Sequence, residues 1–405
     1  MSSRNLYTKL YENISNDYIL VLIGARQTGK TYLLNQLKDQ LQLNKEEVHY
    51  LTLEDPSLLE SLDKHPEELF KYVPKKESSK IFVLIDEIQY LSNPSNFLKY
   101  IYDKYNTSIK LVVTGSSAFY IDKHFKDSLA GRKRIFELYT FSFKEFLNAK
   151  GYTKYTELFN SNYIETKAKK KFLIPQKKEL FNLYVEYITF GGYPRVILTD
   201  SIEEKKIILK ELHTSFLKKD FFESGIRNDI AAYNLLKLLA SQTGNLINSQ
   251  ELANTLNISH TSIRNYLYIL EKSFIVKRCL PFFNNQRKEL SKMPKLFFFD
   301  TGLRNSILSN FDNFQKRADN GSFLENAFYK NLLHSKCDTI NFWRTQSQNE
   351  VDFVLNNNIA FEIKINKNRF NINKYKKFID NYPNIDLKLV TLFDEKNLDI
   401  MDFAI

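Results

Sequence analysis

The sequence predicts an α/β protein whose first part is a doubly wound parallel sheet. Two apolar runs support this prediction: one leads into a glycine-containing loop and a helix-like segment, and another ends in Asp86-Glu87. Strand-like and helix-like segments also alternate along this part of the chain. Continuous apolar runs are typical of parallel strands that are buried on both faces. We therefore expect strands over residues 18–23, 48–53, 81–85 and 110–114.

The loop between the first strand and the helix expected over residues 32–40 is a candidate phosphate-binding loop. It reads Gly24-Ala25-Arg26-Gln27-Thr28-Gly29-Lys30-Thr31. Its glycines allow backbone N–H groups to surround a polyphosphate, and the helix directs its positive N-terminal end toward the same anion. In this pattern Lys30 reaches the β- and γ-phosphates of ATP, and the Thr31 hydroxyl ligates Mg²⁺. The alternative is a glycine turn that happens to contain a lysine.

Polar residues also follow two other predicted strands. At the end of the strand over 81–85, Asp86 would hold Mg²⁺ and Glu87 would orient and polarise the attacking water. Ser116 follows the strand over 110–114 and is a candidate sensor that faces the nucleotide, with a simple serine turn as the alternative. Together these residues predict ATP hydrolysis.

Arg132 and Arg195 are candidates for a cationic contact with the transferred phosphoryl group, which often comes from outside the phosphate-binding loop. Arg195 follows Gly191-Gly192, and two adjacent glycines in a chain with only 11 predict a backbone requirement such as a helix end in a lid. Each arginine would act in cis or from a neighbouring subunit of a homo-oligomer. The alternative is that either one is an ordinary surface charge.

The middle of the chain predicts two helical regions. Residues 148–178 are rich in lysine, with a charge run over 167–171, and predict a surface loop or inserted helix, whereas the helical spacing over 179–222 predicts a small lid.

A helix-turn-helix is predicted from Ser249 to Ser273, with Ser249 and Ser259 as helix N-caps. Strand-like runs over 274–277 and 296–299 would complete a winged helix. This arrangement suits DNA, although a packing module between domains is the alternative. The residues expected to contact DNA lie early in the second helix or beside the wing: His260, Thr261, Arg264 and Lys292, with Arg287, Lys288 and Lys295 nearby.

The C-terminal part predicts a helix, three strands, a helix and a strand, over residues 323–334, 340–344, 351–355, 359–365, 373–381 and 387–392. Asp352 lies early in the second strand, and strand periodicity places Glu362 and Lys364 on one face of the third. With Glu325 from the first helix, the carboxylates would bind Mg²⁺ beside a scissile phosphate while the ammonium stabilises charge. The prediction is a metal-dependent nuclease site with Glu325, Asp352 and Glu362 as ligands. In the alternative, the same residues form a self-satisfied ion-pair cluster without chemistry.

Composition limits the possible partners. The 405 residues carry a formal net charge of +11, which favours polyanionic partners such as DNA but also fits a solvated basic surface. Two cysteines form neither a disulfide framework nor a metal cluster, so a reducing cytoplasm is expected. No stretch approaches the ~18 consecutive apolar residues of a membrane span, and the N-terminus does not read as a signal peptide. We expect a cytoplasmic protein without a membrane partner.

With these motifs, the chain resembles the prokaryotic AAA+-like P-loop ATPases that carry a winged helix and a C-terminal domain with a restriction-endonuclease-like, PD-(D/E)xK core. The resemblance covers nearly the whole chain and rests on residues 24–31, 84–87, 114–117, 130–132, 191–195, 294–303, 350–354 and 361–364. Many AAA+ proteins have an asparagine as first sensor, whereas Ser116 or Thr114 stands there in this chain. The nuclease core also has Glu350-Val351 before Asp352 in place of a Pro-Asp pair.

The resemblance implies four domains: a P-loop ATPase domain (1–147), a helical lid with a lysine-rich insertion (148–230), a winged helix (231–312) and a restriction-endonuclease-like domain (313–405). Our first hypothesis is a DNA-associated protein that binds and hydrolyses ATP with Mg²⁺ and is coupled to a metal-dependent nuclease. The second is a nucleotide-dependent switch that binds DNA or protein and has an inactive nuclease-like domain. A third is an ATPase that remodels protein partners, which would need no nuclease carboxylates.

Overall fold

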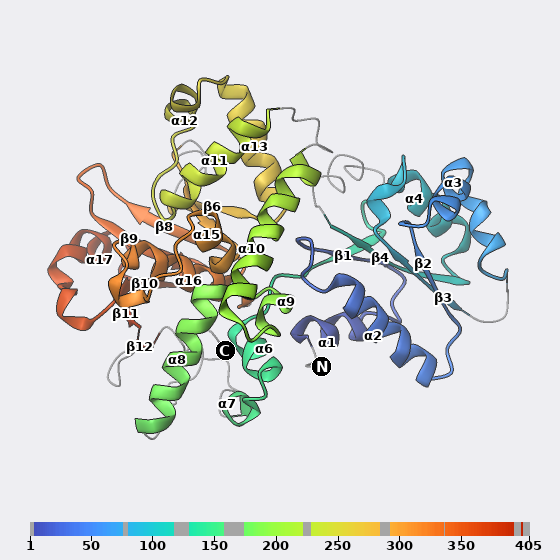
Figure 1. Ribbon diagram of the computed structural model, residues 1–405, viewed down its shortest axis with the longest axis horizontal. Helices are drawn as coiled ribbons and strands as arrows, with labels where there is room; N and C mark the ends of the chain where they lie inside the picture. The colour runs from blue at the N-terminus through green and yellow to red at the C-terminus, as the bar shows by residue number, and fades with distance from the viewer. Residues whose placement is uncertain are drawn as a thin grey trace. The chain divides into compact units, whose positions relative to one another are not determined.

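The computed structural model describes residues 4–75, 80–116, 129–157, 174–221, 228–283, 292–335, 337–392 and 398–399 (Figure 1). The chain divides into two compact units. The first unit is Met1–Tyr139 with Lys272–Phe274, and the second unit is Thr140–Glu271 with Ile275–Ile405. None of the described helices is both long and apolar enough to cross a bilayer.

The first unit contains a five-stranded parallel sheet in the order β2-β3-β4-β1-β5. Its strands are β1 (Ile19–Ile23), β2 (Val48–Thr52), β3 (Ile81–Asp86), β4 (Ile109–Gly115) and β5 (Lys133–Glu137). The four predicted strands are confirmed, and all residues of β1, β3 and β4 are buried, as their apolar runs require. In register, Ile23 lies opposite Gly115 and Glu137, so the carboxyl ends of β1, β4 and β5 share one edge of the sheet.

Helices of the first unit bury apolar side chains against this sheet. They are α1 (Asn5–Glu12), α2 (Lys30–Leu43), α3 (Pro56–Lys64) and α4 (Pro94–Tyr105), with 3-10 turns η1 (Pro66–Lys71) and η2 (Ile88–Tyr90). Leu10 of α1 and Leu33 and Leu37 of α2 share one core with Leu20 and Leu22 of β1. Since α2 starts directly after the glycine-containing loop, this packing fixes the loop against the sheet.

The second unit begins with a helical region. Its helices are α6 (Phe143–Ala149), α7 (Thr153–Glu157), α8 (Ile174–Phe190), α9 (Pro194–Ile197), α10 (Ile202–Phe216), the π-helical turn η3 (Leu217–Phe221), α11 (Asp229–Ser241), α12 (Ser249–Leu256) and α13 (His260–Lys272). The helical pattern expected over 179–222 corresponds to α8, α9, α10 and η3, and the lysine run over 167–171 lies outside the described residues.

Helices α12 and α13 are joined by a short turn where the sequence predicts one, and Asn257 in this turn is left-handed with a φ of 51°. The Ser259 hydroxyl accepts a hydrogen bond from Ser262 N at 3.0 Å, which confirms it as a cap of α13. The Ser249 prediction is wrong because Asn248 caps α12: its Oδ1 accepts from Gln250 N at 3.0 Å and from Glu251 N at 3.3 Å.

The second unit also contains a seven-stranded sheet with the order β12-β11-β10-β9-β8-β6-β7. Its strands are β6 (Val276–Pro281), β7 (Lys295–Phe298), β8 (Ile340–Arg344), β9 (Glu350–Leu355), β10 (Ile359–Lys364), β11 (Asp386–Thr391) and β12 (Leu398–Asp399). The hairpin of β6 and β7, expected as a wing, also pairs with the C-terminal strands, since Leu280-Pro281 align in parallel with Asn341-Phe342. The expected boundary between residues 312 and 313 therefore does not separate two sheets.

The remaining helical segments are α15 (Thr301–Ile307), η4 (Phe314–Lys316), α16 (Asn320–His334), η5 (Lys367–Arg369), η6 (Ile372–Tyr375) and α17 (Lys376–Asn381). Phe328 of α16 packs against Phe353 and Phe361 in the larger core of this unit. Ala360, the residue before Phe361, instead belongs to a second core with Phe378 of α17. Alternation along β10 therefore directs Glu362 and Lys364 to the side of the sheet that η6 and α17 cover.

Candidate functional site

The loop from Gly24 to Thr31 has the geometry of a phosphate-binding loop. A Cβ at Gly24 would lie 2.2 Å from the Leu138 carbonyl oxygen, so only glycine fits there. Gln27 and Gly29 have φ angles of 59° and 96°, in the left-handed region. These turns bring the chain from the end of β1 to the N-terminus of α2, where backbone N–H groups are available for an anion.

Lys30 and Thr31 lie where the sequence predicts them. The Lys30 ammonium is buried and donates hydrogen bonds to Gly24 O at 3.1 Å and Ala25 O at 3.0 Å, so it lies inside its own loop. The Thr31 hydroxyl donates to Asp86 Oδ2 at 2.7 Å. Two hard oxygen donors from two elements therefore meet beside the loop, as a Mg²⁺ ion requires.

Asp86 lies at the centre of a hydrogen-bond network at the edge of the sheet. Its carboxylate also accepts from the Tyr50 hydroxyl at 3.1 Å and from the Thr114 hydroxyl. Burial and the negative charge of Asp86 raise the pKa of Tyr50, so this phenol stays protonated and remains a donor. The network holds the Asp86 carboxylate in one orientation toward Thr31.

Glu87 and Ser116 are brought together by Gln89, which the sequence analysis did not identify. The Gln89 side-chain amide donates to the Glu87 carboxylate and to Ser116 Oγ, the latter at 2.9 Å. Glu87 has a left-handed φ of 58°, and its backbone N–H donates to Thr114 Oγ1 at 3.0 Å. A non-glycine residue in this conformation is uncommon and is often found at functional sites. The predicted residues of the first unit, apart from Arg132, thus form one connected site.

Arg132 lies at the opposite edge of the sheet from this site. Ile19 N donates to Arg132 O at 2.8 Å, and Ile19 is the first residue of β1 whereas the loop follows its last residue. At about 3.3 Å per residue, the five residues of β1 separate the two edges by roughly 16 Å. The guanidinium pairs with Asp103 of α4, with Nε 2.7 Å from Oδ1. The structure thus places Arg132 away from the phosphate-binding loop, and its contact with phosphate, in cis or from a neighbouring subunit, stays a prediction.

Arg195 lies on α9 of the second unit. Its Nη1 is 3.5 Å from Glu211 Oε2, and both side chains are more than half exposed. The two glycines before it do end helix α8, as predicted, and Gly191 has a left-handed φ of 79°. A Cβ on Gly191 would lie 1.9 Å from Asp300 Oδ1. Gly191 is thus required by the close approach of Asp300, and Gly192 by the Phe141 carbonyl oxygen, which would lie 2.4 Å from a Cβ there.

Asp300 is a buried hub of the second unit. It accepts from Gly192 N at 2.8 Å, from Thr140 Oγ1 at 2.8 Å and from Lys330 Nζ at 3.0 Å. Burial opposes ionisation of Asp300, but the Lys330 charge and these hydrogen bonds outweigh it and lower its pKa. The motif at 191–195 therefore has a structural role in joining α8 to α15 and α16.

A cluster of charged side chains lies on the seven-stranded sheet. Asp352 of β9 accepts from Ile363 N at 2.8 Å, and its Oδ2 is 4.0 Å from Lys364 Nζ. Lys364 also pairs with Glu362 on the same face of β10, as strand periodicity predicts. Lys295 of β7 pairs with Glu350 of β9 and lies 3.5 Å from Glu325 of α16. We call these six residues the carboxylate cluster: Lys295, Glu325, Glu350, Asp352, Glu362 and Lys364.

Burial sets the protonation of this cluster. Burial, with the nearby charge of Asp352, raises the pKa of Glu325 to about 7 and that of Glu362 to about 8. Burial also raises the pKa of Asp352. For Lys295 and Lys364, the surrounding carboxylates outweigh burial and raise the pKa, so both stay charged. Two cations are therefore embedded among carboxyl groups, of which Glu325 and Glu362 take up protons near neutral pH.

The predicted three-carboxylate metal site is not formed in this arrangement. Among the described residues, no group of three or more His, Cys, Asp or Glu side chains could hold a metal ion. The physical reason is that lysine ammonium groups occupy the positions beside Glu325 and Glu362. Lys295, expected beside the wing, is the first residue of β7, but it is 2% exposed and belongs to this cluster, so its ammonium is not available to DNA.

The remaining DNA-contact candidates are exposed. His260, Thr261 and Arg264 lie on the first turns of α13, and Lys292 precedes β7. Arg287 and Lys288 lie outside the described residues.

Residues 16–147 match a family described as an AAA domain, and residues 181–313 and 320–405 match two families described as domains of unknown function, DUF8612 and DUF4143. The sequence is 30% identical over 412 residues to the uncharacterized protein MJ1544 of Methanocaldococcus jannaschii, and the alignment covers 97% of this chain and 85% of that protein. The chain belongs to the family of this archaeal protein. An uncharacterized protein of Haemophilus influenzae is 28% identical over 404 residues, covering 95% of this chain and 92% of that protein.

Among solved structures, the Aeropyrum pernix ORC1 protein in complex with DNA aligns with 76% of this chain and 93% of that chain. The identity is 11% and the TM-score is 0.31, which does not establish a common fold. The family match over residues 16–147 and the loop geometry together identify the first unit as a P-loop AAA domain.

One further residue of this AAA domain was missed by sequence reasoning. Arg4, at the N-cap position of α1, is 3% exposed and donates to Thr28 O at 2.6 Å and to Tyr139 O at 2.7 Å. It therefore ties the phosphate-binding loop to the segment that follows β5. An arginine ahead of an amphipathic helix carries no sequence signal for this role.

Proposed function

We propose that this protein binds and hydrolyses ATP and acts in association with DNA. The observation that carries the ATPase part is the 2.7 Å contact between Thr31 Oγ1 and Asp86 Oδ2, which joins the phosphate-binding loop to the end of β3. A glycine turn with an incidental lysine would not require a hydroxyl and a carboxylate from separate elements to meet there.

The residues of this site fit ATP with Mg²⁺. Thr31 and Asp86 would hold the ion, which supplies charge neutralisation to the phosphate oxygens. Lys30 would exchange the carbonyl oxygens of its own loop for the β- and γ-phosphates. Glu87, held by Gln89, would accept a hydrogen bond from the attacking water and orient it. Ser116 would respond to the γ-phosphate through the same Gln89 contact.

Two variants test this assignment. Lys30→Ala should lose ATP binding, and Glu87→Gln should bind ATP but hydrolyse it far more slowly than the wild type, because only the water-orienting carboxylate is lost. Binding is measured by calorimetry and turnover by phosphate release, with exposed Lys9→Ala as the control. If Glu87→Gln hydrolyses ATP at the wild-type rate, Glu87 does not orient the attacking water.

The DNA association rests on the exposed residues His260, Thr261, Arg264 and Lys292 and on the net charge of +11. Phosphate contacts by Arg264 and Lys292 would release counterions. Replacing both with alanine should reduce the slope of log affinity against log salt by about one to two. An unchanged slope would move the DNA contact away from α13.

Metal-dependent cleavage of DNA is a second candidate function. One observation favours it: Glu362 Oε2 is buried and makes no hydrogen bond within 3.5 Å of a described residue. The lysine pairs of the carboxylate cluster instead favour the inactive, nuclease-like alternative, and that is the version we propose. The test is incubation of DNA with Mg²⁺ or Mn²⁺ and ATP. Cleavage by the wild type that Asp352→Asn abolishes would reverse this choice.

A further inference from the structure

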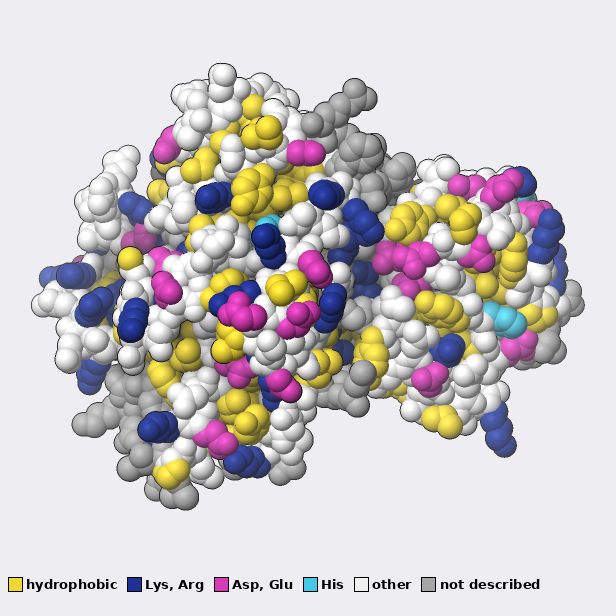
Figure 2. Space-filling model, in the orientation of Figure 1, with side chains coloured by type: hydrophobic (Ala, Val, Ile, Leu, Met, Phe, Trp, Pro, Cys, Tyr) yellow, Lys and Arg dark blue, Asp and Glu magenta, His cyan; other side chains and the backbone are white. Residues whose placement is uncertain are grey.

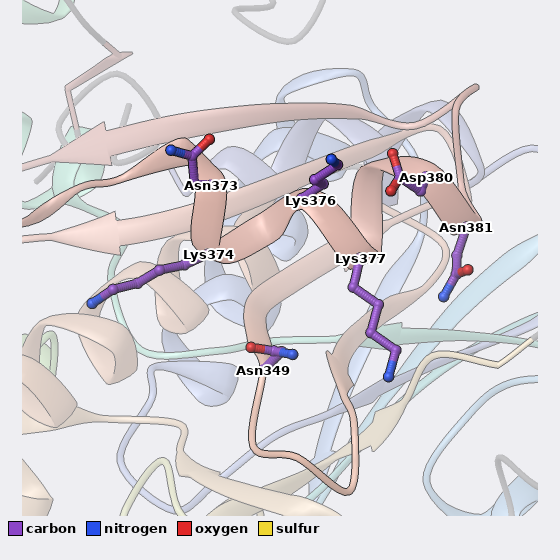
Figure 3. Close-up of a pocket in the computed structure, with 7 residues that line it drawn as sticks. All are labelled: Asn349, Asn373, Lys374, Lys376, Lys377, Asp380 and Asn381. Carbon is purple, nitrogen blue, oxygen red and sulfur yellow. The ribbon is translucent and has the colours of Figure 1, made fainter.

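A basic pocket lies on the surface of the second unit, between the loop before β9 and the helical segment of η6 and α17. Its volume is about 410 Å³. The residues that line it are Asn349, Asn373, Lys374, Lys376, Lys377, Asp380 and Asn381 (Figure 3). We call it the lysine pocket. Figure 3 shows the side chains of Lys374 and Lys377 extending from the helical segment on either side of Asn349.

The positive charge of the lysine pocket is not neutralised by an ion pair with any residue that the structure describes. Lys374, Lys376 and Lys377 are exposed, and none has an acidic partner within 4.0 Å among the residues that the structure describes. Asp380 lines the same pocket without forming an ion pair with a described lysine. In the space-filling view, lysine and arginine side chains gather over the region of α17 (Figure 2).

Other lysines of the described residues form ion pairs with acidic side chains, unlike these three. In the carboxylate cluster, for example, Lys295 and Lys364 are each paired with carboxylates. Like charges brought together on a solvent-exposed segment repel one another, and only salt screens them. A polyanion would relieve this repulsion, and the amides of Asn349, Asn373 and Asn381 would add uncharged hydrogen-bond donors to the same pocket.

The lysine pocket is held next to the carboxylate cluster. Tyr375 lies between Lys374 and Lys376 in the chain, and its buried side chain is close enough to Glu362 that burial and the Glu362 charge raise the pKa of Tyr375. Across the pocket, Asn349 directly precedes Glu350, which pairs with Lys295. Both walls are thus anchored by residues at the cluster, so the backbone of η6 and α17 that carries the lysines is held next to it.

We propose that the lysine pocket binds the phosphate backbone of a nucleic acid. The proposal rests on the DNA association proposed above and names a contact site for it that is separate from α13. Lysine ammonium groups act as point charges for phosphate oxygens, and amide groups position the same backbone without reading sequence. Binding here would be strongly salt-dependent and largely independent of base sequence.

The test uses the full-length protein and a fluorescein-labelled DNA duplex, with affinity measured by anisotropy over a series of salt concentrations. The variant Lys374→Gln with Lys377→Gln removes two charges from the pocket. We expect its slope of log affinity against log salt to fall by about 1.8, at about 0.9 per lost phosphate contact. The control variant Lys9→Gln with Lys99→Gln removes two exposed charges from the first unit and should keep the wild-type slope.

Two further measurements separate binding from folding and from the ATPase. Lys374→Arg with Lys377→Arg should keep DNA binding, because the charge is retained, and ATP turnover without DNA should be unchanged in every pocket variant. If the wild type binds DNA and the glutamine variant binds it with the same slope, the pocket proposal fails while the DNA association stands. If the wild type binds no DNA, the pocket proposal and the proposed DNA association both fail, and the ATPase assignment is unaffected. If inorganic phosphate displaces the labelled duplex as effectively as unlabelled DNA does, the proposal that the pocket binds the backbone of a nucleic acid is also overturned.

Discussion

Replacing Glu362 with glutamine should make the stability of the second unit less dependent on pH. In the folded protein, burial raises the pKa of Glu362 to about 8, whereas the ordinary value is 4.5. Between these values the folded state keeps a proton that the unfolded state has released. The stability that this proton contributes is present below about pH 4.5 and is lost as the pH rises through about 8. Glutamine has the same shape and cannot ionise, so it removes this loss.

The size of the effect follows from the two pKa values. At about 1.4 kcal/mol per pH unit, the interval from 4.5 to about 8 corresponds to an upper bound of about 5 kcal/mol. Relaxation of the cluster reduces it, so we expect the unfolding free energy of the wild type to fall by about 2 kcal/mol or more between about pH 5 and about pH 9. Glu325, with a pKa of about 7, adds a change of the same sign that the variant keeps.

The single tryptophan makes this measurable in a chain of two units. Trp343 of β8 is 3% exposed and packs against Phe378, with ring centroids 5.1 Å apart, so its fluorescence reports unfolding of the second unit. Urea titrations at several pH values would give the slope for the wild type, for Glu362→Gln and for the exposed control Glu251→Gln. The reasoning is refuted if the glutamine variant loses stability with rising pH as steeply as the wild type and the control.

Two other substitutions test structural roles. Arg4→Ala should raise the KM for ATP by about tenfold and lower kcat less, because the loop loses a buried hydrogen bond at Thr28 O. Arg4→Lys should restore part of the affinity. The prediction is contradicted if Arg4→Ala, with a wild-type melting temperature, changes KM and kcat by the same factor. Gly191→Ala should lower the urea midpoint much more than Gly151→Ala, because both glycines have positive φ but only a Cβ at 191 meets a neighbour, Asp300. Equal effects of the two substitutions would mean that backbone strain alone matters.

Local pattern predicted the elements whose burial is uniform. Strands β1, β3 and β4 are buried along their whole length and therefore read as continuous apolar runs. Strand β5 was missed because only one of its five residues, Phe136, is buried and its charged residues hide the strand pattern. The phosphate-binding loop was recognisable because all of its parts lie within eight consecutive residues.

Contacts between residues far apart in the chain could not be predicted in this way. Arg4 lies 24 residues from Thr28, and Lys295 lies 55 residues from Glu350, so neither pair leaves a local pattern. Lys295 also stands among other basic residues in the sequence, which favoured an exposed position until the pairing of β6 with β8 placed it beside β9. The metal-site prediction failed for the same reason: the positions of Asp352 and Glu362 on the strands were predictable, but the position of Lys295 beside Glu325 and Glu350 was not.

The pairing of β6 with β8 decides how the chain can be divided. A fragment beginning near residue 320, where the last family match starts, would lack β6 and leave the edge of β8 unpaired. It would also lack Lys295, so that Glu325 and Glu350 would lose their common cation. An open strand edge next to uncompensated buried acids favours aggregation over folding. A fragment that is to carry the C-terminal sheet therefore has to include the hairpin of β6 and β7.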